Sequence, residues 1–383
     1  MTVTTPGGFE AAGVACGLKS SGAADLALVV NRGPRRAAAA VFTRNRAKAN
    51  PIIWSQQAIA HGEVAAIVLN SGGANCFTGA EGFQTTHATA EAVAEALGVG
   101  AGEVLVCSTG LIGDQLDRGR VLAGVEVAAA ALAADGGDDA ARAIMTTDSV
   151  PKQSVRRRDG WSIGGMAKGA GMLAPGLATM LVVLTTDADL PAAVLDTALR
   201  QATRVTFDRL DSDGCMSTND QVTLLASGAS CIVPTVETFT DELTALCLDL
   251  AQQLQADAEG ASHDIRIEVI GALSDDDAVE VGRSIARNNL FKAAVFGNDP
   301  NWGRVLAAIG TTGAQFDPYD VDVSMNGVRV CTAGGPDRPR DEVDMSGRAL
   351  HVLVDLRAGH VEASILTNDL THDYVHENSA YSS

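Results

Sequence analysis

The sequence predicts a layered α/β fold, because helical patterns and many short strands share the chain without a regular strand–helix–strand succession. Short apolar runs between glycine-rich or polar stretches predict buried strands. Longer alanine- and leucine-rich stretches predict helices. The 383 residues suffice for two domains or for one large layered domain. Since 46% of the residues are apolar but only 4% aromatic, we expect a core of aliphatic side chains.

The individual elements follow in chain order. Strands are expected over residues 26–30, 37–42, 64–69, 103–107, 180–184, 264–269, 321–325, 328–330, 351–356 and 361–366. Helices are expected over residues 83–97, 120–134, 191–206, 240–258 and 275–288. The 264–269 run alternates between apolar and polar residues, which predicts a half-buried strand. Asn326-Gly327 between two apolar runs predicts a hairpin.

Charge and composition narrow the range of partners. The net charge of −19 argues against nucleic acid and anionic membranes. Acidic and basic residues balance up to Ala178, so the excess of acid lies after it. No apolar run is long enough for a membrane span, and the first residues lack the pattern of a secretory signal. Seven scattered cysteines predict reduced thiols in a cytoplasmic protein.

The segment from Lys168 to Thr186 changes character at Thr179. Its first half contains closely spaced residues that interrupt regular structure, namely Gly169, Gly171, Pro175 and Gly176. Its second half is an apolar strand. A hydroxyl between a pliable loop and a rigid strand suits a chain that cuts itself before a Thr and then uses it as an N-terminal nucleophile. The plainer interpretation is that Thr179 only begins a core strand.

Other residues fit the chemistry of such a nucleophile. Thr109-Gly110 follows a strand, where a hydroxyl or backbone N–H can stabilise an oxyanion, although such a sequence is also an ordinary turn. No histidine lies close in sequence to Thr179, so its own α-amino group, with a pKa of about 7.7–8.0, is the simplest base. Lys168 can hold a carboxylate or lower a neighbour's pKa, or it can be a surface lysine.

Several familiar signatures are absent or lack their context. The chain has no Walker P-loop, no dinucleotide-binding glycine motif and no zincin His-Glu-x-x-His. Gly160-Trp-Ser162-Ile-Gly164 matches a nucleophile elbow, but no buried strand is predicted before it and no helix after it. The arginines at 156–158 suggest a solvated loop, with phosphate binding as the alternative.

Longer motifs identify a resemblance to the ornithine acetyltransferase (ArgJ) family of arginine biosynthesis. The matching segments are Thr109-Gly110, Met145-Thr-Thr-Asp148, Lys168-Gly-Ala-Gly-Met-Leu-Ala-Pro175, Leu177-Ala-Thr-Met-Leu181 and Phe296-Gly-Asn-Asp-Pro-Asn-Trp-Gly-Arg304. The resemblance runs from the 70–79 loop to the last residues. It implies an α/β/β/α sandwich of the N-terminal-nucleophile type with a strand-rich C-terminal part. It also implies self-cleavage between Ala178 and Thr179, into an alpha chain of residues 1–178 and a beta chain of residues 179–383.

The resemblance assigns roles residue by residue. Thr179 would be the nucleophile, and Thr109 with Gly110 would form the oxyanion hole. The substrate would contact Thr146, Lys168, Thr179, Glu259, Asn378 and Ser383. Relatives end in Thr where this chain has Ser383, so a hydroxyl remains but a methyl contact is lost. Some relatives have Asp in place of Cys215, to which we assign no role.

The implied reaction is a two-step transfer of the acetyl group from N2-acetyl-L-ornithine to L-glutamate through acetyl-Thr179, with ping-pong kinetics. It needs no cofactor or metal, because one amide replaces an equivalent amide. Family resemblance further implies a heterotetramer of two alpha and two beta chains. Some members also use acetyl-CoA as a donor, and no residue here decides this. The alternatives are an N-terminal-nucleophile amidase that hydrolyses N-acyl amino acids and an uncut, non-enzymatic relative.

Overall fold

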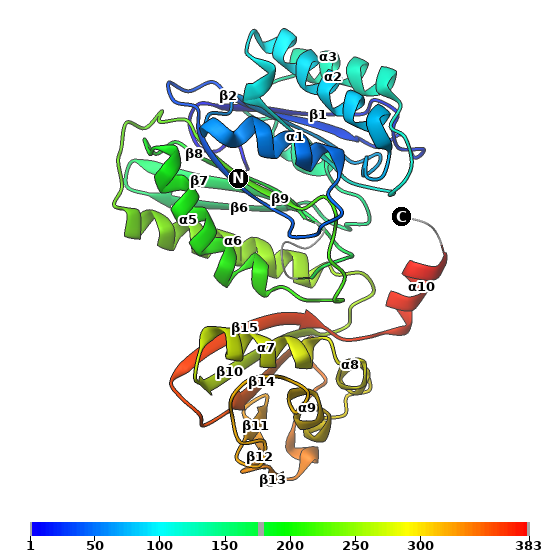
Figure 1. Cartoon of the computed structure of the whole chain (residues 1–383), viewed down its shortest axis with the longest axis vertical. Coiled ribbons are helices and arrows are strands. Elements are labelled where there is room, and N and C mark those ends of the chain that lie inside the picture. Colours follow the sequence, from blue (N-terminus) through cyan, green and yellow to red (C-terminus); the bar gives the residue numbers. More distant parts are fainter. Residues whose placement is uncertain (1, 175–179, 381–383) are drawn as a thin grey trace.

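The structure, a computed structural model that describes residues 2–174 and 180–380, consists of a larger and a smaller α/β body (Figure 1). The first sheet of the larger body has the order β1-β2-β4-β5, formed by Phe9–Val14, Leu26–Asn31, Ala66–Asn70 and Val104–Ser108. Its outer face is covered by α1 (Asn50–Ala58), α2 (Gly79–Leu97) and α3 (Arg118–Ala130). Short 3-10 turns at Ile59–His61 and Ala101–Glu103 lead into β4 and β5.

The second sheet of the larger body has the order β3-β9-β8-β7-β6, formed by Ala37–Phe42, Gln221–Ala226, Leu181–Thr186, Trp161–Lys168 and Lys152–Arg158. Helices α5 (Ala192–Val205) and α6 (Val236–Ala256) cover its outer face. The inner faces of both sheets share one core with α4 (Gly137–Ala143). The larger body is therefore the expected α/β/β/α sandwich.

Strand β8 shows how the sequence fits these layers. All six of its residues are buried, and their side chains alternate between two cores. Val182 and Leu184 pack toward α5 and α6, whereas Leu181 and Val183 pack between the sheets. β8 pairs antiparallel with β7 and parallel with β9. The expected pieces 1–178 and 179–383 thus contribute strands to one sheet and are not separate folding units.

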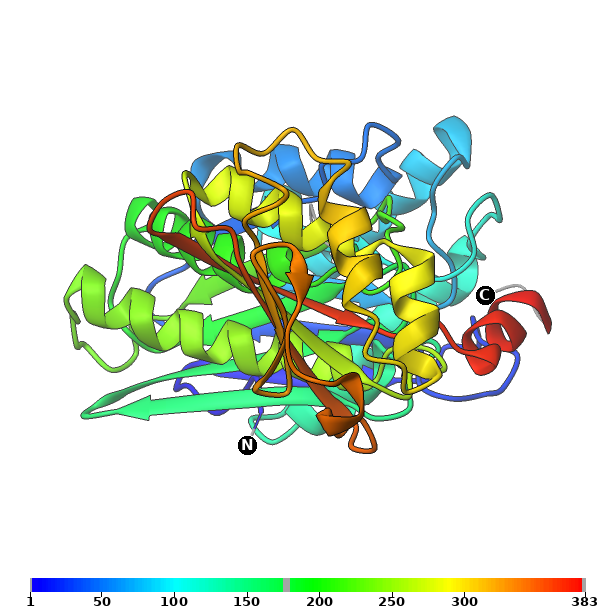
Figure 2. The same ribbon diagram turned by 90° about the horizontal axis from the view of Figure 1, so that it is seen from below.

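The smaller body is a six-stranded sheet with helices on one face (Figure 2). Its order is β13-β12-β11-β14-β10-β15, formed by Gly335–Pro336, Val328–Thr332, Asp322–Met325, Ala349–Asp355, Asp264–Ala272 and Val361–Asn368. Helices α7 (Asp275–Ala286), α8 (Asn289–Phe296) and α9 (Trp302–Ile309) share a core with this sheet. A 3-10 turn lies at Arg340–Glu342, and α10 (His372–Ala380) follows β15 back toward the larger body.

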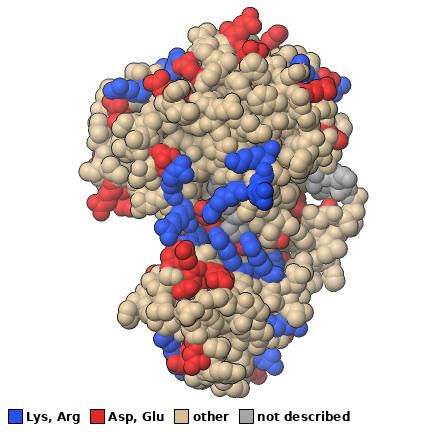
Figure 3. Space-filling view, viewed as in Figure 1, with Lys and Arg blue, Asp and Glu red and all other residues tan. Residues whose placement is uncertain are grey.

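Ion pairs cross the junction of the two bodies. Figure 3 shows Lys and Arg side chains gathered there on one face. Asp275, at the start of α7, receives hydrogen bonds from Arg204 on α5 and from Arg209 in the 3-10 turn Phe207–Arg209. Arg287, just after α7, pairs with the buried Asp211 at 2.8 Å. These contacts join the bodies on the side of α5.

The structure contradicts the sequence interpretation of the segment around residues 156–158. The arginines at 156–158 do not form a loop but end β6, an exposed edge strand that pairs with β7. Gly160, at φ +86°, allows the tight turn between the two strands. Strand β7 was not predicted, because its glycines and serine interrupt the apolar pattern, although all eight of its residues are buried. Ser162 lies on β7 of this hairpin, and its Oγ donates to Asp187, just after β8. The segment is therefore not a nucleophile elbow.

The other expected helices and strands are present, with shifts of a few residues at their ends. In residues 2–174 and 180–380, no helix is long and apolar enough to cross a membrane.

Candidate active site

Most of the predicted site residues meet at one small pocket. Residues from the ends of β5 and β7, the loops after α4 and α6, and helix α10 line a cavity of about 80 Å³. Its lining includes Thr109, Gly110, Thr146, Lys168, Glu259 and Asn378. The remaining predicted residues, Ala178, Thr179 and Ser383, lie outside the described residues. Segments up to 269 positions apart therefore converge, counting from Thr109 to Asn378.

The loop at Thr109 and Gly110 is rigidly held. The Thr109 N–H donates to the Asn70 carbonyl, and the Gly73 N–H donates to the Thr109 carbonyl, both at 3.0 Å. Gly110 has φ +128°, and a Cβ there would lie 2.8 Å from the Gly73 nitrogen, so the position requires glycine. Within residues 2–174 and 180–380, the Gly110 N–H makes no backbone hydrogen bond. It can therefore serve as a donor to a bound group.

Lys168 is a buried lysine at the end of β7, so the alternative of a surface residue is wrong. Its side chain is 2% exposed. Its Nζ lies 2.6 Å from Thr146 Oγ1 and 3.4 Å from Thr109 Oγ1. Burial lowers the pKa of Lys168, although the nearby Asp148 carboxylate opposes this shift. The ammonium group is thus poised between two threonine hydroxyls of the pocket.

Asp148 organises the charges behind the pocket. Its Oδ1 accepts hydrogen bonds from Lys152 Nζ at 2.7 Å and from the Gly169 N–H at 2.6 Å. Its Oδ2 accepts from the Thr146 N–H at 3.0 Å. Burial alone would raise the pKa of Asp148, but the ammonium groups of Lys168 and Lys152 outweigh burial and lower it well below its ordinary value. Asp148 therefore stays ionised and orients the loop of Thr146.

Glu259 forms the opposite wall. Its Oε1 accepts a hydrogen bond from Thr147 Oγ1 at 2.8 Å, and its Oε2 accepts one from Asn378 Nδ2 at 3.0 Å. The backbone of Gly171 passes so close that a Cβ there would lie 2.5 Å from Glu259 Oε2. Glu259, in the expected beta chain, thus contacts Thr147 and Gly171 of the expected alpha chain and Asn378 of α10.

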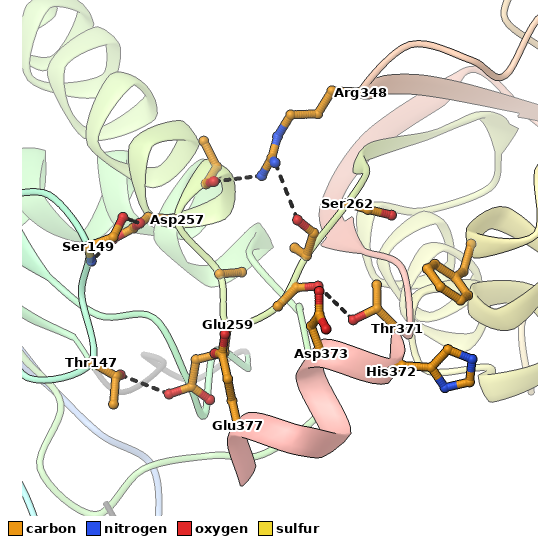
Figure 4. A pocket seen from close by; sticks show the side chains of 15 residues that line it. Thr147, Ser149, Asp257, Glu259, Ser262, Arg348, Thr371, His372, Asp373 and Glu377 are labelled. Atoms are coloured by element: carbon orange, nitrogen blue, oxygen red, sulfur yellow. Dashed lines mark hydrogen bonds between the residues drawn. The ribbon is translucent and has the colours of Figure 1, made fainter.

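A larger pocket of about 480 Å³ adjoins the small one and shares Thr147 and Glu259 with it (Figure 4). Its carboxyl-bearing lining residues are Asp257, Glu259, Asp373 and Glu377. Arg348 also lines it, but its guanidinium group is bound to Asp264 at 2.9 Å. Burial, together with the negative charges of Glu259 and Asp373, raises the pKa of Glu377. Since Asp257 is paired with Lys152, the carboxyl groups that make no ion pair within the described residues are those of Glu259, Asp373 and Glu377, and they favour a cationic ligand.

Sequence reasoning missed the residues that support the site. Lys152 bridges Asp148 and Asp257, the latter at 2.6 Å, although 105 positions separate Lys152 from Asp257. Asn219 holds the end of β5, just before Thr109, because its Nδ2 donates to the Ser108 carbonyl at 2.8 Å. Asp148 stood within a matching motif, which was a usable signal. Nothing local in the sequence marks Lys152, and no role was predicted for the loop that contains Asn219.

Comparisons with known proteins show the family to which this sequence is similar. A model described as "ArgJ family" matches residues 10–383. Proteins called "Arginine biosynthesis bifunctional protein ArgJ" are 63% identical in Streptomyces coelicolor and 64% identical in Streptomyces avermitilis, in both cases over the full length of both chains. The one from Thermobifida fusca is 59% identical, again over both full lengths.

Solved structures of similar proteins were also found. Ornithine acetyltransferase from Mycobacterium tuberculosis, complexed with ornithine, is 57% identical and matches 47% of this chain and 96% of its own, with a TM-score of 0.45. An ArgJ protein from Bacillus halodurans is 32% identical and matches 51% of this chain and 97% of its own, with a TM-score of 0.49. Because the family model spans nearly the whole sequence and full-length relatives are more than 60% identical, this chain belongs to the ArgJ family.

Proposed function

We propose that this protein is a self-cleaving acetyltransferase of arginine biosynthesis that moves the acetyl group of N2-acetyl-L-ornithine to L-glutamate. One observation supports this most strongly. Lys168, which lines the pocket with Thr109 and Gly110, pairs directly with Leu181 in the β7–β8 ladder. Leu181 is two residues after Thr179 in the chain. The strand that begins two positions after Thr179 in the sequence therefore starts beside a lining residue of this pocket.

The first half-reaction forms the acyl-enzyme. After the chain is cut before Thr179, the new α-amino group acts as base for the hydroxyl of the same residue. The hydroxyl oxygen attacks the acetyl carbonyl, and the Thr109 hydroxyl and the Gly110 N–H stabilise the oxyanion. Each such donor contributes about 3–4 kcal/mol in other enzymes. Ornithine then leaves as a free amine, and the acetyl group remains on Thr179.

The second half-reaction returns the enzyme to its starting state. The amino group of L-glutamate attacks the acetyl ester, and N-acetylglutamate leaves with the acetyl group. Because one amide is broken and an equivalent amide is formed, the exchange requires no ATP, metal or cofactor. Both substrates pass through one acyl-enzyme, so the kinetics are ping-pong.

Charge arrangement supports the choice of substrate. The buried ammonium group of Lys168 suits the α-carboxylate that ornithine and glutamate share. The adjoining pocket, with the carboxyl groups of Glu259, Asp373 and Glu377, suits the side-chain ammonium of ornithine. We assign substrate contacts to Thr146, Lys168, Glu259 and Asn378, and extend them to Ser383 from the family motif alone.

Further expectations come from the relatives. They are named bifunctional, and we propose acetyl-CoA as a second acetyl donor for glutamate. We also propose a cytoplasmic assembly of two alpha and two beta chains. Release of CoA thiol on mixing the enzyme with acetyl-CoA and L-glutamate tests the second activity, and the mass of the native assembly tests the tetramer.

Initial-rate kinetics test the main proposal. With N2-acetyl-L-ornithine and L-glutamate both varied, double-reciprocal plots should give parallel lines. Intersecting lines would contradict the shared acyl-enzyme. Acetate release without any acceptor amine would instead indicate an amidase. A chain that stays uncut and inactive would indicate a non-enzymatic relative.

A further inference from the structure

Asp220 is a buried carboxyl group to which neither the motifs nor the pocket assign a role. It directly precedes β9 and is 0% exposed. Its Oδ1 accepts a hydrogen bond from the Met180 N–H at 3.1 Å. Its Oδ2 has no hydrogen-bond partner in the part of the chain that the structure describes. A fully buried carboxyl group with one unused oxygen is costly, so its retention requires an explanation.

The N–H group that bonds Asp220 belongs to Met180, which directly follows the expected nucleophile Thr179 in the sequence. The Met180 N–H belongs to the planar peptide unit that begins at the Cα atom of residue 179. The next peptide unit is held as well, because the Gln221 N–H donates to the Met180 carbonyl at 3.2 Å. Two successive peptide planes are therefore fixed where the chain enters β8. Met180 is therefore held through both its N–H and its carbonyl group.

Asn219, the residue before Asp220, contacts the backbone that leads into the expected oxyanion hole. Asn219 Nδ2 donates to the Ser108 carbonyl at 2.8 Å and to the Ala74 carbonyl at 2.6 Å. Ser108 directly precedes Thr109. The backbone of Asp220 is itself anchored, since the Thr43 N–H donates to its carbonyl at 3.0 Å. One dipeptide thus ties the loop of Thr109 to the start of β8.

The surroundings of Asp220 disfavour its charged form. Burial raises the pKa of Asp220 well above its ordinary value. Hydrogen bonding by Met180, Ser217 and Thr43 and the positive charge of Lys168 oppose this shift only in part. A neutral acid keeps one oxygen as acceptor for the Met180 N–H and offers the other as an O–H donor. Asparagine reproduces both properties at almost the same size.

We propose that Asp220 is a positioning residue that holds the Met180 N–H at the start of β8, directly after the expected nucleophile in the chain. It makes no contact with substrate and acts through the backbone of Met180. The inference rests on the proposed function, since it takes Thr179 as the nucleophile.

The test compares three variants of the full chain. Asp220→Leu removes the acceptor, and it should slow self-cleavage and lower kcat about 100-fold, with the KM for N2-acetyl-L-ornithine nearly unchanged. Asp220→Asn should stay within about threefold of the wild type in kcat. Gln221→Leu is the matched control, because Gln221 is equally buried, also has an unpartnered side-chain oxygen among the described residues and directly follows Asp220 in the chain. The kcat of Gln221→Leu should stay within the same range as that of Asp220→Asn.

The outcomes separate this inference from the proposed function. Equal kcat in wild type and Asp220→Leu, or equal losses in the Leu and Asn variants, would overturn the role of Asp220. If Asp220→Leu does not fold, Asp220→Ser replaces it with the same expected loss of kcat, because its side chain is too short to reach Met180. Thr179→Ala serves as the reference. If that variant is still cut and active, the proposed function itself fails, whatever the Asp220 variants do.

Discussion

Lys168 Nζ lies 3.8 Å from Asp148 Oδ2, with both side chains almost entirely excluded from solvent. The same ammonium group reaches Thr146 Oγ1, and the same carboxylate accepts the Thr146 N–H. Thr146 is therefore held through both its backbone and its side chain by one buried ion pair. This arrangement keeps a positive charge at the wall of the pocket at a fixed distance from the threonine hydroxyls.

Removing the ammonium group should impair the reaction more than the fold. Lys168→Met should lower kcat/KM about 10- to 100-fold, the equivalent of roughly 1.5–3 kcal/mol for a charged hydrogen bond. Asp148 retains Lys152 as its partner, so the protein should remain folded. Steady-state kinetics measure the effect. Lys48→Met, which removes a lysine bonded to Gln56 on α1, should leave kcat/KM unchanged. Equal losses in both variants would contradict the role of Lys168.

Asp148 should make stability depend on pH in a defined direction. Its folded-state pKa lies below its ordinary value, so its contribution is complete above the unfolded pKa of about 3.9. The contribution is lost as the pH falls through the folded-state pKa. Asp148→Asn should therefore lower the free energy of unfolding by roughly 3–5 kcal/mol at pH 7, as for other broken buried pairs.

Urea denaturation at a series of pH values tests this prediction. The difference between wild type and Asp148→Asn should shrink as the pH falls below about 4. Asp196→Asn is the control, because the carboxylate of Asp196 is 45% exposed and pairs with Arg200 on the surface of α5. It should cost less than about 1 kcal/mol. A difference for Asp148→Asn that does not depend on pH would show that its charge is not the source of stability.

The hydroxyl of Thr109 should matter for the transition state and little for binding. Thr109→Val keeps the shape of the side chain but removes the donor, so kcat should fall about 100- to 1,000-fold with a small change in KM. Thr109→Ser keeps the hydroxyl and should retain most of the activity. A Ser variant as slow as the Val variant would mean that the methyl group, and not the hydroxyl, is required.

Gly171 should affect substrate binding through Glu259. A Cβ at this position would lie 2.5 Å from Glu259 Oε2, so Gly171→Ala should displace the carboxylate. The KM for N2-acetyl-L-ornithine should rise about tenfold, the equivalent of roughly 1.4 kcal/mol for one weakened hydrogen bond. Gly347→Ala is the control, because a Cβ there meets nothing within 4 Å. An unchanged KM in Gly171→Ala would exclude Glu259 from substrate binding.

The sequence predicted much of the fold because its strands are short, apolar and well separated. The strand expected over 37–42 is β3 with the same bounds, and the run at 180–184 overlaps β8. The β6–β7 hairpin was missed, because exposed arginines and buried glycines give no alternation to detect. The layer order came from the family motifs and not from local patterns, which do not specify how sheets pack.

The chemistry of the site was predictable only as far as its motifs reach. Motifs identified Thr109, Lys168 and Glu259, which the structure brings together at one pocket. The burial of Lys168 and its partnership with Asp148 depend on tertiary packing, which no single motif records. The contact between Asp220 and Met180, which are 40 positions apart, likewise depends on tertiary packing.

The acyl-enzyme itself provides the most direct test of the account. The purified protein is incubated with N2-acetyl-L-ornithine without glutamate, quenched in acid and analysed by mass spectrometry. Two chain pieces are expected, with a single acetyl group on the peptide that begins at Thr179, and this group should be lost when L-glutamate is added. An uncut active chain, or an acetyl group carried by any other residue, would contradict this expectation.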